Sequence, residues 1–453
     1  MKQLKVKRMI IFISILIVLI IILMIGITLF QKEEERQEEI EILDKGNFIP
    51  TSYEKTIVTD HSTFFSVAEC VQKYLDGLSL NVNEISSTPV PGTKMRSATT
   101  IYAENQDITD EESKKEAIYN FLSASYIEQN HITKDNVLDK IEDKEQVELI
   151  PLKMYELLGN YKTQYALYGK IKSTDKEQEV YYIINVDKTN NAFNITPVER
   201  NKYDDVNDIP LGEKDEPIEQ NKNNIFSYKI MQENEIAQKY FTYYKKLMQE
   251  DPEAAYNLLD EEYRNKRFCS LEEFKTYVDK NKEEIKNYLA KEYEANKIAE
   301  RTEYICKDQY QHYYTYDVTA VMQFTVKLDN YTVESEEIKQ KYEGANEKRK
   351  VQMNADKWIL MLNNKDYKAA YEVLDESFRE QYFGTVEKFE EYMRGRFPEY
   401  YGLTFSDFSE EAGVYIQKIL LTDIRAKQDF VLPETIIMKL TDDGFKMSFR
   451  ILN

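Results

Sequence analysis

Few residues of this sequence have the types and spacing that covalent chemistry requires. Ser173 and Lys176 have the Ser-x-x-Lys spacing in which a serine can act as a nucleophile. That pair lies in a polar turn, however, and the companion motifs of such enzymes are missing from the chain. The sequence also contains no phosphate-binding glycine loop, no dinucleotide fingerprint and no calcium-binding loop of the helix-loop-helix type.

Histidines and clustered acids offer little for proton transfer or metal binding. The chain has only three histidines, at His61, His131 and His312, which is too few for most histidine-based metal sites. Segment 204–208 (DDVND) brings three aspartates close together, but no further ligands follow at regular spacing. We therefore expect no catalytic residue, no cofactor-binding residue and no metal ligand, and we expect that the protein is not an enzyme.

The three cysteines do not form a disulfide framework. Cys70 lies among apolar residues of a predicted helix, which favours a place in a core. Cys269 and Cys306 fall within one predicted unit. A disulfide between them is one interpretation if this part of the chain is outside the cell, and two buried free thiols are the other.

Composition and charge exclude two broad classes of protein. The formal net charge is −21, whereas a nucleic-acid binder needs a basic surface. We therefore expect no nucleic-acid partner. The 453 residues are 42% hydrophobic and include 35 tyrosines and 21 phenylalanines, which is enough for packed cores and argues against wholesale disorder.

The first residues predict a membrane anchor. Residues Met9–Phe30 form an uncharged run of 22 residues, and about 20 apolar residues span a bilayer as a helix. A cleaved signal peptide is the main alternative, but its apolar part is usually shorter and ends at small residues. Four bases precede the run and acids follow it. The sequence therefore predicts a cytoplasmic N-terminus (1–8), one transmembrane helix (9–30), a charged stalk (31–49) and an extracellular remainder.

An internal repeat organises the remainder of the chain. Residues Glu253–Val278 and Lys368–Met393 align without gaps at an offset of 115, with 11 of 26 positions identical. A weaker third copy, Glu116–Ile141, aligns with the first of these at an offset of 137. The identical positions are mostly apolar or aromatic, so the repeat indicates a shared packing unit. Among them, Tyr256 and Tyr371, and Phe274 and Phe389, are expected to superpose and to be buried.

Hydrophobic periodicity predicts the same order of elements in every copy. An amphipathic helix comes first, at 63–78, 235–248 and 351–362, because apolar residues recur there at three- and four-residue steps. Alternating strands come last, because Tyr, Val, Ile, Phe and Thr recur there at every second position. The expected strands are 164–171, 179–186, 313–326, 415–421, 435–440 and 446–451. The expected fold class is α+β, with a transmembrane helix followed by three tandem cone-like units in which helices pack on a curled antiparallel sheet. The units are expected at 50–200, 233–338 and 339–453, with a linker at 201–232.

This order resembles the nuclear-transport-factor-2-like fold. The phrase Asp366–Arg379 (DYKAAYEVLDESFR) is similar to a motif of its bacterial extracytoplasmic versions. Some members of the fold are enzymes that use a His, Asp or Tyr inside the cone, so the resemblance makes His312, Tyr316 and Asp317 candidates for such a role. None of the three histidines recurs between the copies, which favours structural roles.

The resemblance also implies a role in the cell envelope. Bitopic scaffold subunits of conjugation and type IV secretion machines likewise join a short cytoplasmic segment, one membrane helix and outward domains of this fold. We therefore expect a membrane-anchored extracytoplasmic scaffold of the bacterial envelope whose partners are other envelope proteins. The alternative is an extracellular binding module that uses its cone pockets for a lipid, a peptide or a wall fragment. The oligomeric state is left open.

Overall fold

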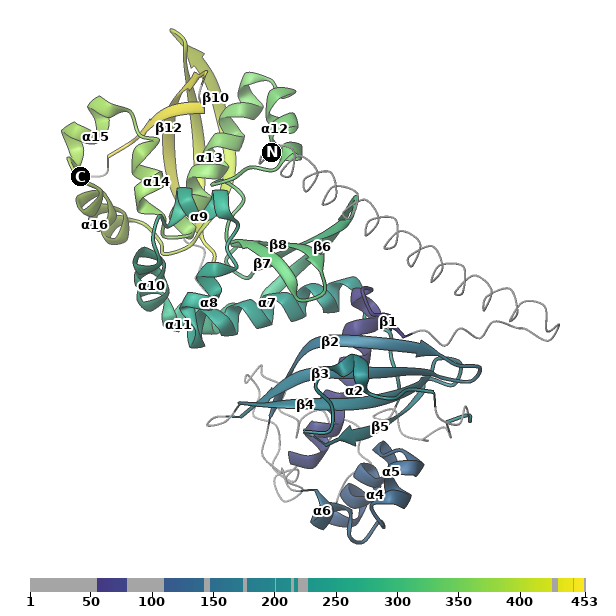
Figure 1. Ribbon diagram of the computed structural model, residues 1–453. Coiled ribbons are helices and arrows are strands. Elements are labelled where there is room, and N and C mark those ends of the chain that lie inside the picture. Colours follow the sequence, from purple (N-terminus) through teal and green to yellow (C-terminus); the bar gives the residue numbers. More distant parts are fainter. Residues whose placement is uncertain are drawn as a thin grey trace, which may run out of the picture.

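Three antiparallel sheets and the helices packed against them make up the described chain (Figure 1). The computed structural model describes residues 55–79, 110–141, 147–173, 177–199, 201–212, 216–218, 227–425, 431–442 and 444–451. Each sheet has the simple order in which strands consecutive in the sequence are neighbours. The repeated α+β units that the sequence indicates are therefore present.

Unit 1 places one long helix against a five-stranded sheet. Its helices are α2 (His61–Ser79), α4 (Glu111–Phe121), α5 (Ala124–Gln129) and α6 (Val137–Lys140). Its strands are β1 (Thr56–Ile57), β2 (Glu148–Leu158), β3 (Thr163–Lys172), β4 (Glu177–Asp187) and β5 (Ala192–Val198). The short helix η2 (Val206–Asp208) buries Val206 against the second face of this sheet, where Ile209, Ala166 and Tyr181 join it. The start of the expected linker therefore belongs to the fold of unit 1.

Unit 2 has five helices and four strands. The helices are α7 (Glu233–Glu250), α8 (Pro252–Asn257), α9 (Glu261–Arg267), α10 (Leu271–Lys280) and α11 (Lys282–Asn287). The strands are β6 (Ala290–Ile298), β7 (Arg301–Asp308), β8 (Tyr313–Ala320) and β9 (Gln323–Lys327). Residues 313–326, where the sequence predicted one strand, instead form the hairpin of β8 and β9. The chain turns between these strands at Met322, which has a positive φ of 61°.

Unit 3 repeats the plan of unit 2. Its helices are α12 (Glu336–Glu343), α13 (Glu347–Asn363), α14 (Tyr367–Glu372), α15 (Glu376–Tyr382) and α16 (Val386–Arg396). Its strands are β10 (Tyr401–Glu411), β11 (Val414–Asp423), β12 (Val431–Thr441) and β13 (Gly444–Phe449). The long helix α13 packs across β10, β11 and β12, as α7 does across β6 and β7 (Figure 1).

The fold class expected from the sequence requires a correction. In the part of the chain that the structure describes, no helix is both long and apolar enough to cross a bilayer. The reason is that the long helices are amphipathic: α7 buries Ile236, Tyr240 and Tyr244 on one face and exposes Gln238 and Lys239 on the other. The transmembrane helix expected at 9–30 lies outside the described residues. The described fold is α+β with three antiparallel sheets.

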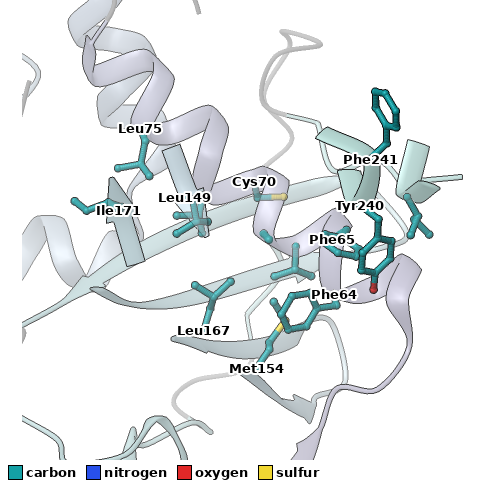
Figure 2. Packing of buried hydrophobic residues seen from close by; sticks show 14 of the residues in the cluster. Phe64, Phe65, Cys70, Leu75, Leu149, Met154, Leu167, Ile171, Tyr240 and Phe241 are labelled. Atoms are coloured by element: carbon teal, nitrogen blue, oxygen red, sulfur yellow. The ribbon is translucent and has the colours of Figure 1, made fainter. Parts of the chain in front are cut away.

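Units 1 and 2 share one hydrophobic core, whereas unit 3 has its own. A single cluster of buried residues extends from α2 and the first sheet through α7 to the second sheet. Figure 2 shows Phe65 of α2 beside Tyr240 of α7, and their ring centroids are 5.5 Å apart in an edge-to-face arrangement. A separate cluster around Trp358, Phe389 and Phe449 fills unit 3.

Candidate functional site

The polar residues of the repeated phrase begin helices. The side chain of Asp260 accepts a hydrogen bond from the backbone N–H of Tyr263 at 2.9 Å, and Asp375 accepts one from Phe378 at 3.3 Å. Ser123, which replaces the aspartate in unit 1, accepts the same bond from Tyr126 at 3.3 Å. Serine and aspartate are both good N-caps, so unit 1 keeps the cap although it lacks the aspartate.

The same three positions attach the helices to the last strand of each sheet. The backbone N–H groups of Ser123, Asp260 and Asp375 donate to Ile195, Val326 and Met447, at 2.9, 3.0 and 2.7 Å. The preceding leucines, Leu122, Leu259 and Leu374, form parallel bridges to those same strand residues. The repeated phrase therefore joins helix to sheet in all three units, which is a structural role.

The repeated arginines do not pair with these aspartates. The guanidinium of Arg264 lies 5.3 Å from the ring centre of Tyr256, and that of Arg379 lies 5.5 Å from the ring centre of Tyr371. Asp260 and Asp375 therefore cap the helices that follow them and do not pair with the arginines four residues further on. Unit 1 has Ile127 at the arginine position.

Backbone shape explains why the residues after the short helices differ. His131, Cys269 and Gly384 lie at or beside equivalent points and have φ values of 51°, 48° and 74°. This left-handed conformation favours glycine and ends helices. The position is thus defined by its backbone, and three unrelated side chains occupy it.

His312 has the surroundings of a catalytic histidine but is enclosed by protein. Its Nδ1 lies 2.9 Å from Oδ2 of Asp308, and its Nε2 lies 2.9 Å from the backbone oxygen of Asn363 in α13. Both ring nitrogens lie within hydrogen-bond distance of oxygen acceptors. The side chain is 4% exposed, so no substrate reaches it. His312 therefore connects unit 2 to unit 3.

The residues around His312 complete the contact between units 2 and 3, which we call the Asp308–His312 junction. Asp308 also accepts bonds from the backbone N–H groups of Tyr310 and His312 and from the hydroxyl of Tyr314. The ring of Tyr310 stacks on that of Tyr400 in unit 3, with centroids 4.2 Å apart. These contacts satisfy the buried carboxylate.

Cationic side chains cover Tyr400 at the edge of the junction. Lys365 lies 4.1 Å and Arg425 lies 5.1 Å from the centre of its ring. Burial lowers the pKa of Lys365 to about 8, although Glu284 and Glu399 oppose that shift. The hydroxyl of Tyr400 donates to Glu284 of unit 2.

A second ion pair joins the same two units. Arg267 at the end of α9 lies 3.1 Å from Asp366, and the hydroxyl of Tyr331 donates to Asp366 at 3.3 Å. Both charged side chains are nearly buried, at 13% and 5% exposure. Asp366 also caps α14 by accepting from Ala369, whereas the equivalent Asp251 caps α8 alone. No pattern in the sequence indicates this second role.

The remaining candidates are scattered through the fold. His61 meets the hydroxyl of Tyr304 at 3.0 Å between units 1 and 2, and burial lowers its pKa while Asp60 opposes the shift. His131 is exposed. Tyr316 is fully buried, and Asp317 pairs with Arg301 on the sheet. None of these groups meets another of them to form an acid–base pair.

The cysteines are free thiols, and Asp205 of segment 204–208 has structural partners. Cys269 is an exposed free thiol, and Cys306 is a buried one whose pKa burial raises to about 12. Cys70 is free and buried in the core, as expected. Asp205 caps η2 and pairs with Lys153, and no cluster of three or more metal-binding side chains occurs among the described residues. Lys176 of the Ser-x-x-Lys pair lies outside them.

Tyrosine and phenylalanine rings fill the space between α7 and the second sheet. Tyr240 contacts Tyr304, Tyr316 and Phe324, with centroids 5.5, 6.2 and 5.0 Å apart. Tyr244 packs edge-to-face on Tyr316 and donates to the backbone oxygen of Ala255. The interior that holds the active site in enzymes of the resembled fold is occupied here by core side chains.

Surface hollows lie at the margins of the sheets. One, of about 520 Å³, lies between β6 and the start of α7. Another, of about 560 Å³, lies between α15 and the last two strands, with Tyr382, Ile437 and Phe449 among its walls. Both hollows are open at the surface and have exposed apolar side chains in their walls, Ile230 in the first and Tyr382 and Ile437 in the second.

The fold and these sites define the chain as a tandem array of α+β units whose buried polar groups serve caps and junctions. Neither a protein-family model nor a curated protein matches its sequence. The family resemblance therefore stays a prediction.

Proposed function

We propose that this protein is an interaction scaffold of the bacterial cell envelope. The observation that carries the proposal is the use of its polar residues. Those that resemble catalytic groups, above all Asp308 and His312, fasten one unit to the next, and the repeated aspartates cap helices. A scaffold needs units held in fixed relation, and these contacts supply that.

The filled interior favours this role over the alternative of a ligand-binding cone. Aromatic side chains occupy the space between α7 and its sheet, so a lipid, peptide or wall fragment would have to displace core residues. Several large apolar side chains instead lie on the outside, including Leu158 at 66% and Tyr382 at 49% exposure. Tyr382 and Ile437 both border the hollow beside the last two strands, and aromatic and apolar side chains that are gathered in one place are typical of protein interfaces.

The envelope location rests on the sequence alone. The uncharged run at 9–30 and the charges around it favour an N-terminus in the cytoplasm and a remainder outside the cell. A subunit of a conjugation or secretion machine is a narrower form of the proposal and rests on the family resemblance. Protease added to intact protoplasts should digest the chain beyond residue 31, and protection of unit 3 would contradict this location.

Crosslinking in living cells tests the contact role directly. A photoreactive amino acid is placed at the exposed apolar positions Leu158 and Tyr382, and, as matched controls, at the exposed polar positions Glu253 and Lys282. We expect covalent adducts with other proteins from the first pair and few from the second. Recovery of monomers alone, together with a turnover activity that one polar substitution abolishes, would favour an enzyme instead.

A further inference from the structure

In unit 1 the short strand β1 covers the outer edge of β2. Strand β1, just before α2, pairs antiparallel with β2 through Thr56 and Ile57. The backbone N–H of Val58 donates to Met154 at 2.9 Å, and the side chain of Val58 is 6% exposed. A short extended segment with one buried apolar side chain therefore completes this sheet.

The segment before the equivalent helix of unit 2 takes a different path. Ser227 forms a bridge with Ala192 of β5, and the N–H of Tyr228 donates to Asn191 at 2.7 Å. The hydroxyl of Ser66 accepts from Met231, and that of Ser62 donates to it, which ties the segment to α2. This segment therefore follows unit 1 and does not pair with β6.

Strand β6 consequently has an open outer edge. Within the described ranges it pairs with β7 alone, and no other backbone hydrogen bond reaches its outer side. The hollow of about 520 Å³ lies between this strand and the start of α7. Its walls are Ser62, the segment 230–234 and the segment 293–295, and Ile230 is 55% exposed.

We propose that the outer edge of β6 binds an extended segment of a partner protein as an added antiparallel strand. An unpaired edge supplies backbone donors and acceptors, and a neighbouring pocket selects side chains, as in other complexes formed by strand addition. Here one apolar side chain of the partner enters the hollow against Ile230 and Tyr293, as Val58 enters the core beside β2. This inference rests on the proposed contact role and names one of its surfaces.

Charge selects the kind of segment that binds. Of the two acids that line the hollow, Glu233 pairs with Lys297 of β6 at 3.4 Å, whereas Glu294 has no ion-pair partner among the described residues, and the whole chain has a net charge of −21. Like charge disfavours a second copy of this chain, whereas a segment with lysine or arginine beside its apolar residue is attracted. The charges on β6, from Lys291 to Lys297, also oppose indiscriminate edge-to-edge pairing.

A designed peptide pair tests the edge in the full-length protein. One synthetic peptide carries the sequence of residues 55–59, KTIVT, between two lysines at each end, and its matched control carries two glutamates at each end. Hydrogen exchange is followed on the protein with each peptide at millimolar concentration. We expect the lysine peptide to slow exchange at 293–297 and the glutamate peptide to have at least tenfold weaker effect. Protection by neither peptide, or equal protection by both, would overturn the proposal.

Two variants separate binding at the edge from a change in fold. Glu294→Lys should reverse the preference between the two peptides, and Glu253→Lys, which changes an exposed acid on α8, should leave it unchanged. A photoreactive residue at position 230 then reports the occupant in cells. Adducts to another protein support the proposal, and adducts to a second copy or to residues 80–109 of the same chain overturn it. If position 230 gives no adduct while Tyr382 does, this inference fails and the scaffold role stands.

Discussion

Single residues show what the repeat preserves. At equivalent points the chain keeps a cap, a backbone conformation or an apolar contact, and lets the chemical identity of the side chain change. Ser123 does what Asp260 does, and His131 shares with Gly384 only the sign of φ. Chemistry would require the reverse, because a shared active site needs the same functional groups.

Exchanging the residues of the left-handed position should change stability in opposite directions. A side chain in this conformation costs about 1 kcal/mol relative to glycine, and a Cβ at Gly384 would meet no atom within 4 Å. We therefore expect Gly384→Ala to lower the free energy of unfolding by about 1 kcal/mol and Cys269→Gly to raise it by about 0.5 kcal/mol, after the entropy of the unfolded chain is counted. Urea denaturation measures both, and changes of equal sign would contradict this account.

Removing the junction histidine should be costly. His312→Leu removes the buried hydrogen-bonding partner of Asp308 and of the backbone oxygen of Asn363, so we expect a loss of about 2–4 kcal/mol in the free energy of unfolding. Adding Asp308→Asn should restore part of that loss, because the buried carboxyl group that lost its partner is then gone. His131→Asn is the control, since asparagine tolerates the left-handed backbone at that exposed position. A silent His312→Leu would show that the junction does not hold the units.

One buried acid should give the protein a distinctive pH dependence. Burial raises the pKa of Asp76 in α2 to about 6, although a hydrogen bond from Gln72 opposes the shift. In the unfolded chain the pKa returns to about 4, so the folded protein binds more protons between these values and loses stability as the pH rises through the window. We expect Asp76→Asn to remove that loss. Unfolding curves of the two proteins that stay parallel from pH 4 to pH 6 would refute it.

Elements differ in how far the sequence alone predicts them. The long helices were predicted close to their observed ends, because each has one apolar face. The helix α13 was expected at 351–362 and covers Glu347–Asn363. Interior strands such as β3 and β4 lie where the sequence predicted strands, because their aromatic and β-branched residues are buried over most of the length of each strand. Six strands were missed, namely β1, β2, β5, β6, β7 and β10. In β2, β6 and β10 a register shift breaks the alternation, as between Ala290 and Glu292 in β6.

The short helices of units 2 and 3 are equivalent in sequence but not in burial. Phe274 and Phe389 are both fully buried, as expected, whereas Tyr371 is 9% exposed and Tyr256 only half-buried. The expectation that both tyrosines are buried is therefore wrong for Tyr256. The sequence does not reveal this difference, because it depends on how each helix meets its neighbours.

The tyrosine pair gives a test at the scale of the helix. Tyr371→Ala removes a buried ring from α14 and should lower the free energy of unfolding by about 3–5 kcal/mol. Tyr256→Ala removes a half-buried ring and should cost less, although both rings are stacked on an arginine. Calorimetry of the two variants checks the order, and an equal or smaller loss for Tyr371→Ala would contradict the burial.

At the scale of the molecule, the two junctions differ in kind. Between units 1 and 2 the contact is apolar, with Phe65 against Tyr240. Lys239 and Glu69 lie at its border. Burial alone would raise the pKa of Glu69, but the nearby Lys239 lowers it. Between units 2 and 3 the contact is largely polar and aromatic, through His312, Asn363 and Tyr400. The sequence predicted a linker before unit 2, because segment 201–232 is polar. The arrangement of the units depends on contacts between segments that are far apart in the sequence. No local sequence pattern predicts such contacts.

A shared core predicts that units 1 and 2 unfold together. Phe65 is 6% exposed and lies in the cluster that spans both units, so Phe65→Ala should lower the free energy of unfolding by about 3–5 kcal/mol. Because cooperative units open as a whole, the amides of both α2 and α7 should exchange faster in this variant. Those of α13 should change less, since unit 3 has a separate core. Tyr371→Ala is the reciprocal case and should accelerate exchange mainly in unit 3. Faster exchange confined to α2 in Phe65→Ala would mean that the apolar contact joins two independently folding units, and the scaffold would then be flexible at that point.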